Sequence, residues 1–305
     1  MDDQGIRQAR EILSGMKLFW CLDDREILLT RIGGRGNLAF RVDHAGEQYV
    51  LHIPGQGTKD GIDHGHEAKA AREAAKAGAG PDVLHFDPAT GVMVTRLVDD
   101  AVAMSAEKFK SIAGAAGRAG LVLRKLHGSA AKFDFRFEPF STIEGYLKTL
   151  AAKSADLPPG ASDVMRQAET VRKALNARPL PVAPCHCDPL CENFLDTDKR
   201  MWIVGWEHSG MGDPLWDVGG LLADGQVTST QEEELIQAYF GGDPAPAVRG
   251  RIIAYKALCD LLWALRGLLL PAEKTPADTA KRFERCQELM ARSEFQFHVA
   301  AVAKG

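Results

Sequence analysis

Short apolar segments separated by glycine-containing turns dominate the first hundred residues of the chain. Such segments, bounded by such turns, are typical of antiparallel strands. Residues 63–77 break the pattern because they are rich in Ala, Glu and Lys, and Asp63 stands where a helix N-cap is expected. With a leading helix at 5–18, this predicts a five-stranded antiparallel sheet with one inserted helix. The predicted strands are residues 26–32, 37–43, 47–53, 82–87 and 91–98.

After residue 98 the apolar positions recur every three to four residues, which is the period of a helix. Residues 105–127 predict one helix, in which Gly114, Gly117 and Gly120 recur every third residue and would let another element approach closely. Further helices are predicted at 141–152, 161–177 and from 216 onward, and a strand–turn–strand at 193–205.

The change of pattern near residue 98 predicts an α+β fold with two lobes. Residues 1–98 would form a small N-terminal lobe built on the sheet, and residues 99–305 a larger, mainly helical C-terminal lobe. The segment 99–102 would be the hinge between them. Residues 225–250 contain a Gly–Gly pair and two prolines, and this stretch is therefore expected to be a loop.

Composition narrows the classes of function. Of the 305 residues, 45% are hydrophobic and 26% charged, as in an ordinary globular protein. The formal net charge of -4 argues against a nucleic-acid partner, because phosphate contacts need a basic surface. No apolar run approaches the roughly 18 residues that span a bilayer, and the first residues lack the apolar core of a signal peptide. We therefore expect a cytoplasmic protein with no membrane partner.

The six cysteines are sparse and do not form a disulfide framework. Cys185, His186, Cys187 and Cys191 lie close enough in sequence to be weighed as a zinc site. Zinc sites usually combine two such pairs, and no second Cys/His pair has that spacing here. Reduced thiols are the favoured interpretation.

The strongest chemical signal is the stretch His186-Cys-Asp188-Pro-Leu-Cys-Glu-Asn193, an H-x-D-x-x-x-x-N pattern. In phosphoryl transfer, a carboxylate orients or deprotonates the accepting hydroxyl, and an amide oxygen five residues later helps to hold magnesium. A short loop can present both groups to one point. The alternative is a loop whose His, Asp and Asn side chains satisfy backbone groups only.

Two further features stand where such chemistry needs them. Gly33, Gly34 and Gly36 precede Asn37 between two predicted strands, and a turn of this kind can cover phosphates with backbone N–H groups. Glu67 lies on the helix after the third strand, where it could pair with a cation on that strand. Each feature alone also fits a plain explanation: an ordinary hairpin turn, and a solvated helix glutamate.

Taken together, these stretches resemble the choline/ethanolamine kinase branch of the aminoglycoside phosphotransferase-like kinases. The resemblance spans nearly the whole chain in family order. The stretches that carry it are TRIGGRGNLAFRV (30–42), YVLHIPGQGT (49–58), the helix with Glu67, VLHFDPATGVMVTRLV (83–98), LRKLH (123–127), HCDPLCENF (186–194), IVGWEHSGMGDPLWDVGGLLAD (203–224) and LLWALRG (261–267).

The resemblance implies a bilobal, protein-kinase-like fold that binds ATP with magnesium in its N-terminal lobe. It also implies transfer of phosphate to the hydroxyl of a small amine-bearing alcohol. Asp188 would be the catalytic base and Asn193 a magnesium ligand, and Asp217 is retained as well. The nucleotide would contact Gly34, Asn37, His52, Glu67 and, near the adenine, Leu97. The acceptor would contact Glu207, His208, Trp263 and Arg266.

Two departures from the family pattern fall on magnesium and phosphate. The family sequence I-D-W-E reads Val-Gly205-Trp-Glu207 here, so a second magnesium carboxylate is missing, and Glu207, Asp196 or Asp198 would have to replace it. An Asp introduced at position 205 would then raise magnesium affinity. The Arg or Lys expected on the third strand is His52, whose imidazole carries little charge at neutral pH unless a phosphate or Glu67 favours its protonation.

Two more departures fall on the amine of the acceptor. The Tyr that follows W-E in the family is His208, and the W-x-x-W stretch that helps to cage a quaternary ammonium reads Trp263-Ala-Leu-Arg266. Replacing an aromatic ring by a cation removes a cation–π contact and adds repulsion toward a charged amine. Trp263 and Arg266 could equally be a buried aromatic residue and a surface base on one helix.

The clustering of these changes leaves two main hypotheses. In the first, the chain is a kinase with a rearranged metal site and a different acceptor, such as an anionic one facing Arg266. In the second, it is a pseudokinase that binds a nucleotide or small ligand without turnover. We favour the kinase, because Asp188, Asn193, Glu67 and Asp217 are all present. An aminoglycoside phosphotransferase is a weaker alternative.

Overall fold

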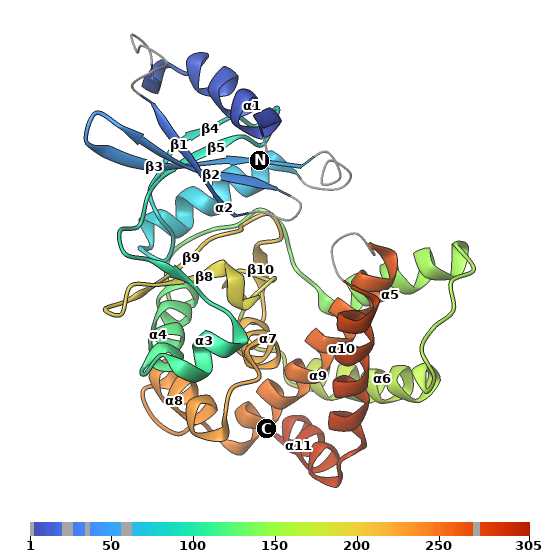
Figure 1. Ribbon diagram of the computed structural model, residues 1–305. Coiled ribbons are helices and arrows are strands. Elements are labelled where there is room, and N and C mark those ends of the chain that lie inside the picture. Colours follow the sequence, from blue (N-terminus) through green and yellow to red (C-terminus); the bar gives the residue numbers. More distant parts are fainter. Residues whose placement is uncertain (1–2, 20–26, 34–36, 56–62, 271–274) are drawn as a thin grey trace.

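The computed structural model describes residues 3–19, 27–33, 37–55, 63–270 and 275–305, and Figure 1 shows a twisted sheet above a group of helices. The sheet is antiparallel with the strand order β1-β2-β3-β5-β4, which confirms the five-stranded prediction. Its strands are β1 (Leu28–Gly33), β2 (Leu38–His44), β3 (Glu47–Ile53), β4 (Val83–Phe86) and β5 (Met93–Arg96).

Two helices cover the two faces of this sheet (Figure 1). Helix α1 (Asp3–Ser14), followed by a 3-10 turn at Lys17–Phe19, packs its apolar residues against buried strand residues such as Phe40 and Leu51. Helix α2 (His64–Lys76) begins at Asp63, whose carboxylate accepts hydrogen bonds from the backbone of Gly65 and His66. The predicted N-cap is therefore confirmed, and it fixes where the first turn of α2 lies.

The alanine face of α2 belongs to a second, larger core that continues through the helical part of the chain. Helix α2 therefore lies between the sheet and the helices below it, as Figure 1 shows. Because α2 and residues of β4 and β5 such as Phe86 and Met93 belong to this larger core, the boundary at residue 98 stays a prediction.

The helical part is organised around α9, which is buried along most of its length and packs against α5, α7, α10 and α11. None of the described helices combines the length and apolar character that crossing a lipid bilayer requires. The helices are α3 (Ala106–Ser111), α4 (Ala115–His127), α5 (Pro139–Ala152), α6 (Ala161–Ala177), α7 (Leu215–Gly225), α8 (Ser229–Phe240), α9 (Pro246–Leu269), α10 (Pro276–Ala291) and α11 (Ser293–Lys304).

Two small sheets sit between α2 and the helices. In one, β7 (Ala183–Cys185) pairs with β10 (Gly210–Gly212). In the other, β8 (Phe194–Asp196) pairs with β9 (Met201–Ile203), as the predicted strand–turn–strand required, and with β6 (Val102–Ala103). The loop 186–193 therefore runs from one small sheet to the other, and these small sheets lie on the far side of α2 from the large sheet (Figure 1).

Two predictions in the helical part are wrong. The helix predicted at 105–127 is two helices, because Ile112 is extended and Gly114 takes a positive φ of 73°. The loop predicted at 225–250 contains α8, because Thr228 and Gln231 form a capping box and Gly241 ends the helix with a positive φ. The close approach predicted at the glycines is confirmed, since α8 packs on Gly117 and Gly120 of α4.

Candidate active site

The loop 186–193 is held from below by the first turn of α7. The fully buried carboxylate of Asp217 accepts the backbone N–H of His186 at 2.6 Å and that of Cys187 at 2.9 Å. The indole N–H of Trp216 donates to the carbonyl of Cys187 at 3.0 Å. Cys187 has a positive φ of 67°, which a non-glycine residue adopts only when its surroundings impose it. These contacts fix the direction in which the next residue, Asp188, points.

The carboxylate of Asp188 is bound on both oxygens by groups of α9. Trp263 donates its indole N–H to Oδ1 at 2.9 Å, and a guanidinium nitrogen of Arg266 lies 3.8 Å from Oδ2. Burial alone raises the pKa of Asp188, but Arg266, then His208 and His186, and the indole hydrogen bond outweigh it. The pKa therefore stays below its ordinary value, and the carboxylate is charged at neutral pH.

Asn193 is tied to the same residue. Its amide nitrogen donates to the backbone carbonyl of Asp188 at 2.9 Å, which leaves the amide oxygen to face Gly205. A Cβ atom on Gly205 would lie 2.8 Å from that oxygen, and Gly205 has a positive φ of 80°. The backbone at position 205 thus disfavours any side chain, so an Asp placed there would displace Asn193 before it could serve as a ligand.

Of the three acidic residues proposed to replace the missing carboxylate, two already pair with Arg118. Both oxygens of buried Asp196 bind Arg118, at 2.8 Å and 2.6 Å, and join the β8–β9 hairpin to α4. Asp198 is 89% exposed and lies 3.6 Å from the same guanidinium. The remaining donors are the Asn193 amide oxygen and the Glu207 carboxylate. Oxygen donors of this kind fit magnesium, which is usually bound by one or two carboxylates together with substrate phosphates.

The groups expected to meet the phosphates differ from a lysine–glutamate pair. Glu67 is only 4% exposed and bonds to His64 Nδ1 of its own helix at 3.1 Å, rather than to the strand as predicted. Burial raises the pKa of Glu67 to about 7, the His64 hydrogen bond opposes this, and the charge of Glu207 adds to it. Burial also lowers the pKa of His52, whose Nδ1 atom makes no hydrogen bond within the described part of the chain. His52 is thus a weak source of positive charge.

The other predicted nucleotide contacts lie at the ends of sheet strands. The side-chain oxygen of Asn37 accepts the backbone N–H of Gly55 at 3.0 Å, which joins the start of β2 to the end of β3. The backbone N–H of Leu97 donates to the carbonyl of Gln48 at 3.0 Å. Gly34 lies outside the described residues. The nucleotide-binding roles of all three stay predictions.

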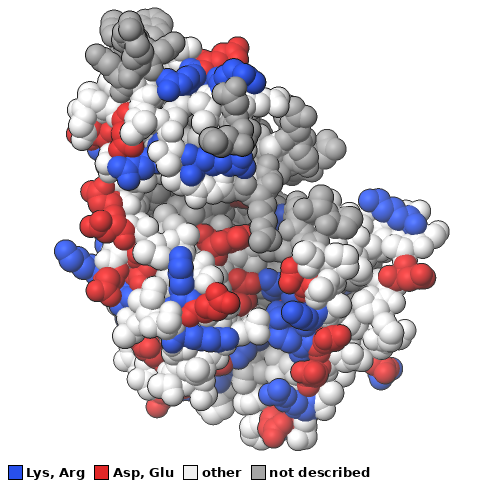
Figure 2. Space-filling model, viewed as in Figure 1, with Lys and Arg blue, Asp and Glu red and all other residues white. Residues whose placement is uncertain are grey.

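Four of the predicted catalytic and acceptor residues are brought together. Besides its contact with Asp188, Arg266 contacts His208 Nε2 at 3.1 Å. Trp263 is 5% exposed, and the guanidinium of Arg282 lies 4.6 Å from the centre of its ring. Figure 2 shows acidic and basic side chains around the hollow between the sheet and the helices. That hollow is where the sequence prediction would place the reaction.

The loop-clamping role of Asp217 was not predicted, although its presence was noted. Its partners are 30 and 31 positions away, and no local pattern marks them. His127 Nε2 donates to the same carboxylate at 3.0 Å, and His127 Nδ1 contacts the Tyr239 hydroxyl at 2.8 Å. His127, Cys185 and Asp217 form the one cluster of possible metal ligands in the described ranges. Asp217 already binds His127 and two backbone N–H groups, and burial raises the pKa of the Cys185 thiol, which disfavours the thiolate that a metal would need.

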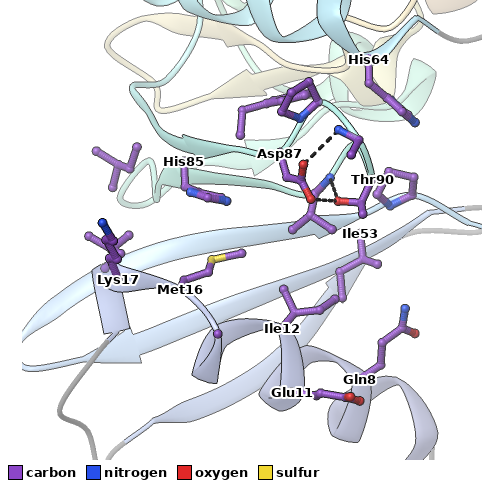
Figure 3. A pocket seen from close by; sticks show the side chains of 18 residues that line it. Gln8, Glu11, Ile12, Met16, Lys17, Ile53, His64, His85, Asp87 and Thr90 are labelled. Atoms are coloured by element: carbon purple, nitrogen blue, oxygen red, sulfur yellow. Dashed lines mark hydrogen bonds between the residues drawn. The ribbon is translucent and has the colours of Figure 1, made fainter.

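A second hollow lies away from this site. A groove of about 1360 Å³ lies between α1 and the β4–β5 turn. Figure 3 shows the side chains that line it. Its lining includes Ile12, Met16, His85 and Asp87, and none of the predicted catalytic or acceptor residues. His64, the partner of Glu67, lines this groove as well.

Comparisons with known proteins identify the family of the chain. Residues 29–250 match the model of the phosphotransferase enzyme family. The structure of a choline/ethanolamine kinase family protein from Mesorhizobium loti is 52% identical, with a TM-score of 0.90 over 98% of this chain and 99% of that one. The choline kinase LicA of Streptococcus pneumoniae is 22% identical, with a TM-score of 0.76 over 94% and 99% of the two chains.

Among curated proteins, protein LicA of Haemophilus influenzae is 27% identical over 228 residues, which are 73% of this chain and 66% of that protein. The mixed α/β fold, with its antiparallel sheet and its group of helices, is therefore that of choline kinases and related phosphotransferases. The chain belongs to the phosphotransferase enzyme family.

Proposed function

We propose that this protein transfers the γ-phosphoryl group of ATP to the hydroxyl of a small amino alcohol, as a choline/ethanolamine kinase does. The observation that carries the proposal is the fixed, charged carboxylate of Asp188. Trp263 holds one of its oxygens, and the loop beneath it is clamped by Asp217. The likeness to the 52% identical choline/ethanolamine kinase family protein supports the class of acceptor.

In this reaction the hydroxyl oxygen of the acceptor forms a bond to the γ-phosphorus, and the bond between that phosphorus and the β–γ bridging oxygen breaks. ADP leaves with the bridging oxygen, and the hydroxyl proton passes to the Asp188 carboxylate. Because the pKa of Asp188 is low, its main task is to orient the hydroxyl and to receive the proton late in the transfer. Trp263 and the Asp217 clamp prevent the carboxylate from turning away.

Asn193 and Glu207 would hold magnesium, which neutralises charge on the phosphates as they transfer. Asn193 is suited to this because its hydrogen bond to the Asp188 carbonyl orients the amide oxygen. With Gly205 in place of a carboxylate, the site has fewer charged ligands than the family pattern. The phosphates themselves must therefore supply more of the coordination.

One specific observation favours a second candidate, a pseudokinase that binds a nucleotide without turnover. The two positions that should carry charge toward magnesium and phosphate are a glycine at 205 and a buried histidine at 52 with a lowered pKa. Loss of such groups weakens the stabilisation of the transferring phosphoryl group more than it weakens binding of the nucleotide.

The test is ADP release from ATP and magnesium in the presence of a panel of amino alcohols. Wild-type turnover that Asp188→Asn abolishes and Asp198→Asn retains would support the kinase, since Asp198 is the exposed aspartate of the β8–β9 turn. If the wild type shows no turnover but nucleotide raises its melting temperature without magnesium, the result supports the pseudokinase hypothesis.

A further inference from the structure

We propose that the accepted alcohol also carries an anionic group, a carboxylate or a phosphate, which Arg266 binds. This inference rests on the proposed phosphotransfer and narrows its acceptor. It follows from where Arg266 lies relative to Asp188, and from what already occupies the ring of Trp263.

Arg266 borders the part of the catalytic carboxylate that an acceptor must use. Trp263 holds Oδ1 of Asp188 at 2.9 Å, so an acceptor hydroxyl is left with Oδ2. The Nη1 atom of Arg266 lies 3.8 Å from that same Oδ2. In a two- or three-carbon alcohol, a substituent next to the hydroxyl carbon is therefore within reach of the guanidinium.

The guanidinium has a fixed place and can be reached from outside. A guanidinium nitrogen also lies 3.1 Å from His208 Nε2, so His208 helps to hold Arg266 in place. The side chain of Arg266 is 23% exposed and that of Asp188 is 12% exposed. A small ligand can thus reach both side chains.

An acceptor whose only charged group is an ammonium finds little to bind it beside Arg266. Trp263 is 5% exposed, its N–H is committed to Asp188, and Arg282 already lies over its ring as the cation. An acceptor ammonium beside Arg266 would be repelled by it. A planar guanidinium suits the opposite charge, because its N–H groups match the oxygens of a carboxylate or phosphate.

The experiment compares alcohols that differ in one anionic group. Ethanolamine with L-serine tests the carboxylate, and glycerol with glycerol 3-phosphate tests the phosphate. In each pair that the wild type phosphorylates, we expect the anionic alcohol to have at least a tenfold higher kcat/KM than its partner. Arg266→Met should remove that preference while leaving the KM for ATP within about twofold. Arg166→Met, a control on the exposed side of α6, should retain the preference.

A binding arm separates failure of this inference from failure of the proposed function. Calorimetry with the same four alcohols, in the presence of a non-hydrolysable ATP analogue, does not require turnover. Asp188→Asn should abolish turnover yet tighten binding of the anionic member, because a negative charge beside Arg266 is gone. Equal binding and equal turnover of both members of both pairs, unaffected by Arg266→Met, would overturn the inference. Anion binding that depends on Arg266 without any turnover would overturn the kinase proposal instead.

Discussion

Replacing Glu67 by Gln should change how the stability of the protein depends on pH. The Glu67 carboxyl is 4% exposed, and burial raises its pKa from 4.5 to about 7. The folded protein therefore binds the Glu67 proton more tightly than the unfolded chain does. Between about pH 4.5 and pH 7, the free energy of unfolding must fall as pH rises, because folding increasingly requires burial of a charge.

The size of the effect follows from the shift. A shift of the Glu67 pKa from 4.5 to about 7 lowers the free energy of unfolding by about 3 kcal/mol once the carboxyl is charged. This loss is complete above pH 7 and absent below pH 4.5. Glutamine keeps the shape of the side chain and does not titrate. The variant should gain up to about 3 kcal/mol on the wild type as pH is raised across this window. His52 acts in the opposite direction, because its lowered pKa costs stability as pH falls through its ordinary value, but it is present in both proteins and cancels in the difference.

The measurement is urea unfolding of both proteins at half-unit steps from pH 4.5 to pH 8. Glu73→Gln is the matched control, because Glu73 lies on the same helix but pairs with the exposed Lys76. The control should follow the wild-type curve. Parallel curves for Glu67→Gln and the wild type over the whole range would show that Glu67 titrates normally. The account of a buried carboxyl with a histidine partner would then be wrong.

Two further predictions concern the catalytic loop. Trp263→Phe removes the hydrogen bond to Asp188 Oδ1 while keeping an aromatic ring, so kcat/KM should fall roughly tenfold to a hundredfold, as expected for a charge-assisted bond of about 1.5–3 kcal/mol; unchanged kinetics would show that this bond does not position the carboxylate. Gly205→Ala and Gly205→Asp should each cost about 1–2 kcal/mol in thermal unfolding, because φ is 80° and the new Cβ meets Asn193. Neither should raise magnesium affinity measured by calorimetry, and a tighter site in Gly205→Asp would refute the steric argument.

The sequence predicted the elements whose signals are local. The strands of the large sheet are bounded by turns, α6 was placed at residues 161–177 where it lies, and Asp63 caps α2 as its position indicated. The errors also have local causes. A single residue with positive φ, Gly114, divides the helix predicted at 105–127, and a capping box beginning at Thr228 outweighs the glycines and prolines around α8.

The contacts of the site were harder to predict, because they depend on residues far apart in the chain. The H-x-D-x-x-x-x-N pattern located Asp188 and Asn193, but nothing near them in sequence indicates that Asp217 holds their loop. Likewise, the sequence placed Glu67 opposite the third strand, whereas its partner is three residues before it on the same helix. Pairing of this kind is decided by side-chain direction and burial, which a one-dimensional pattern does not contain.

The departures from the family pattern act in opposite directions at the two ends of the site. At the phosphate end, burial keeps His52 largely neutral, and His64 engages Glu67, so less positive charge faces the nucleotide than a lysine would supply. At the acceptor end, Arg266 adds a permanent positive charge next to Asp188. An acceptor that carries an ammonium and no anionic group would be repelled by Arg266. An acceptor that also carries an anionic group gains an ion pair with Arg266, and the choice of acceptor is therefore decided at this end of the site.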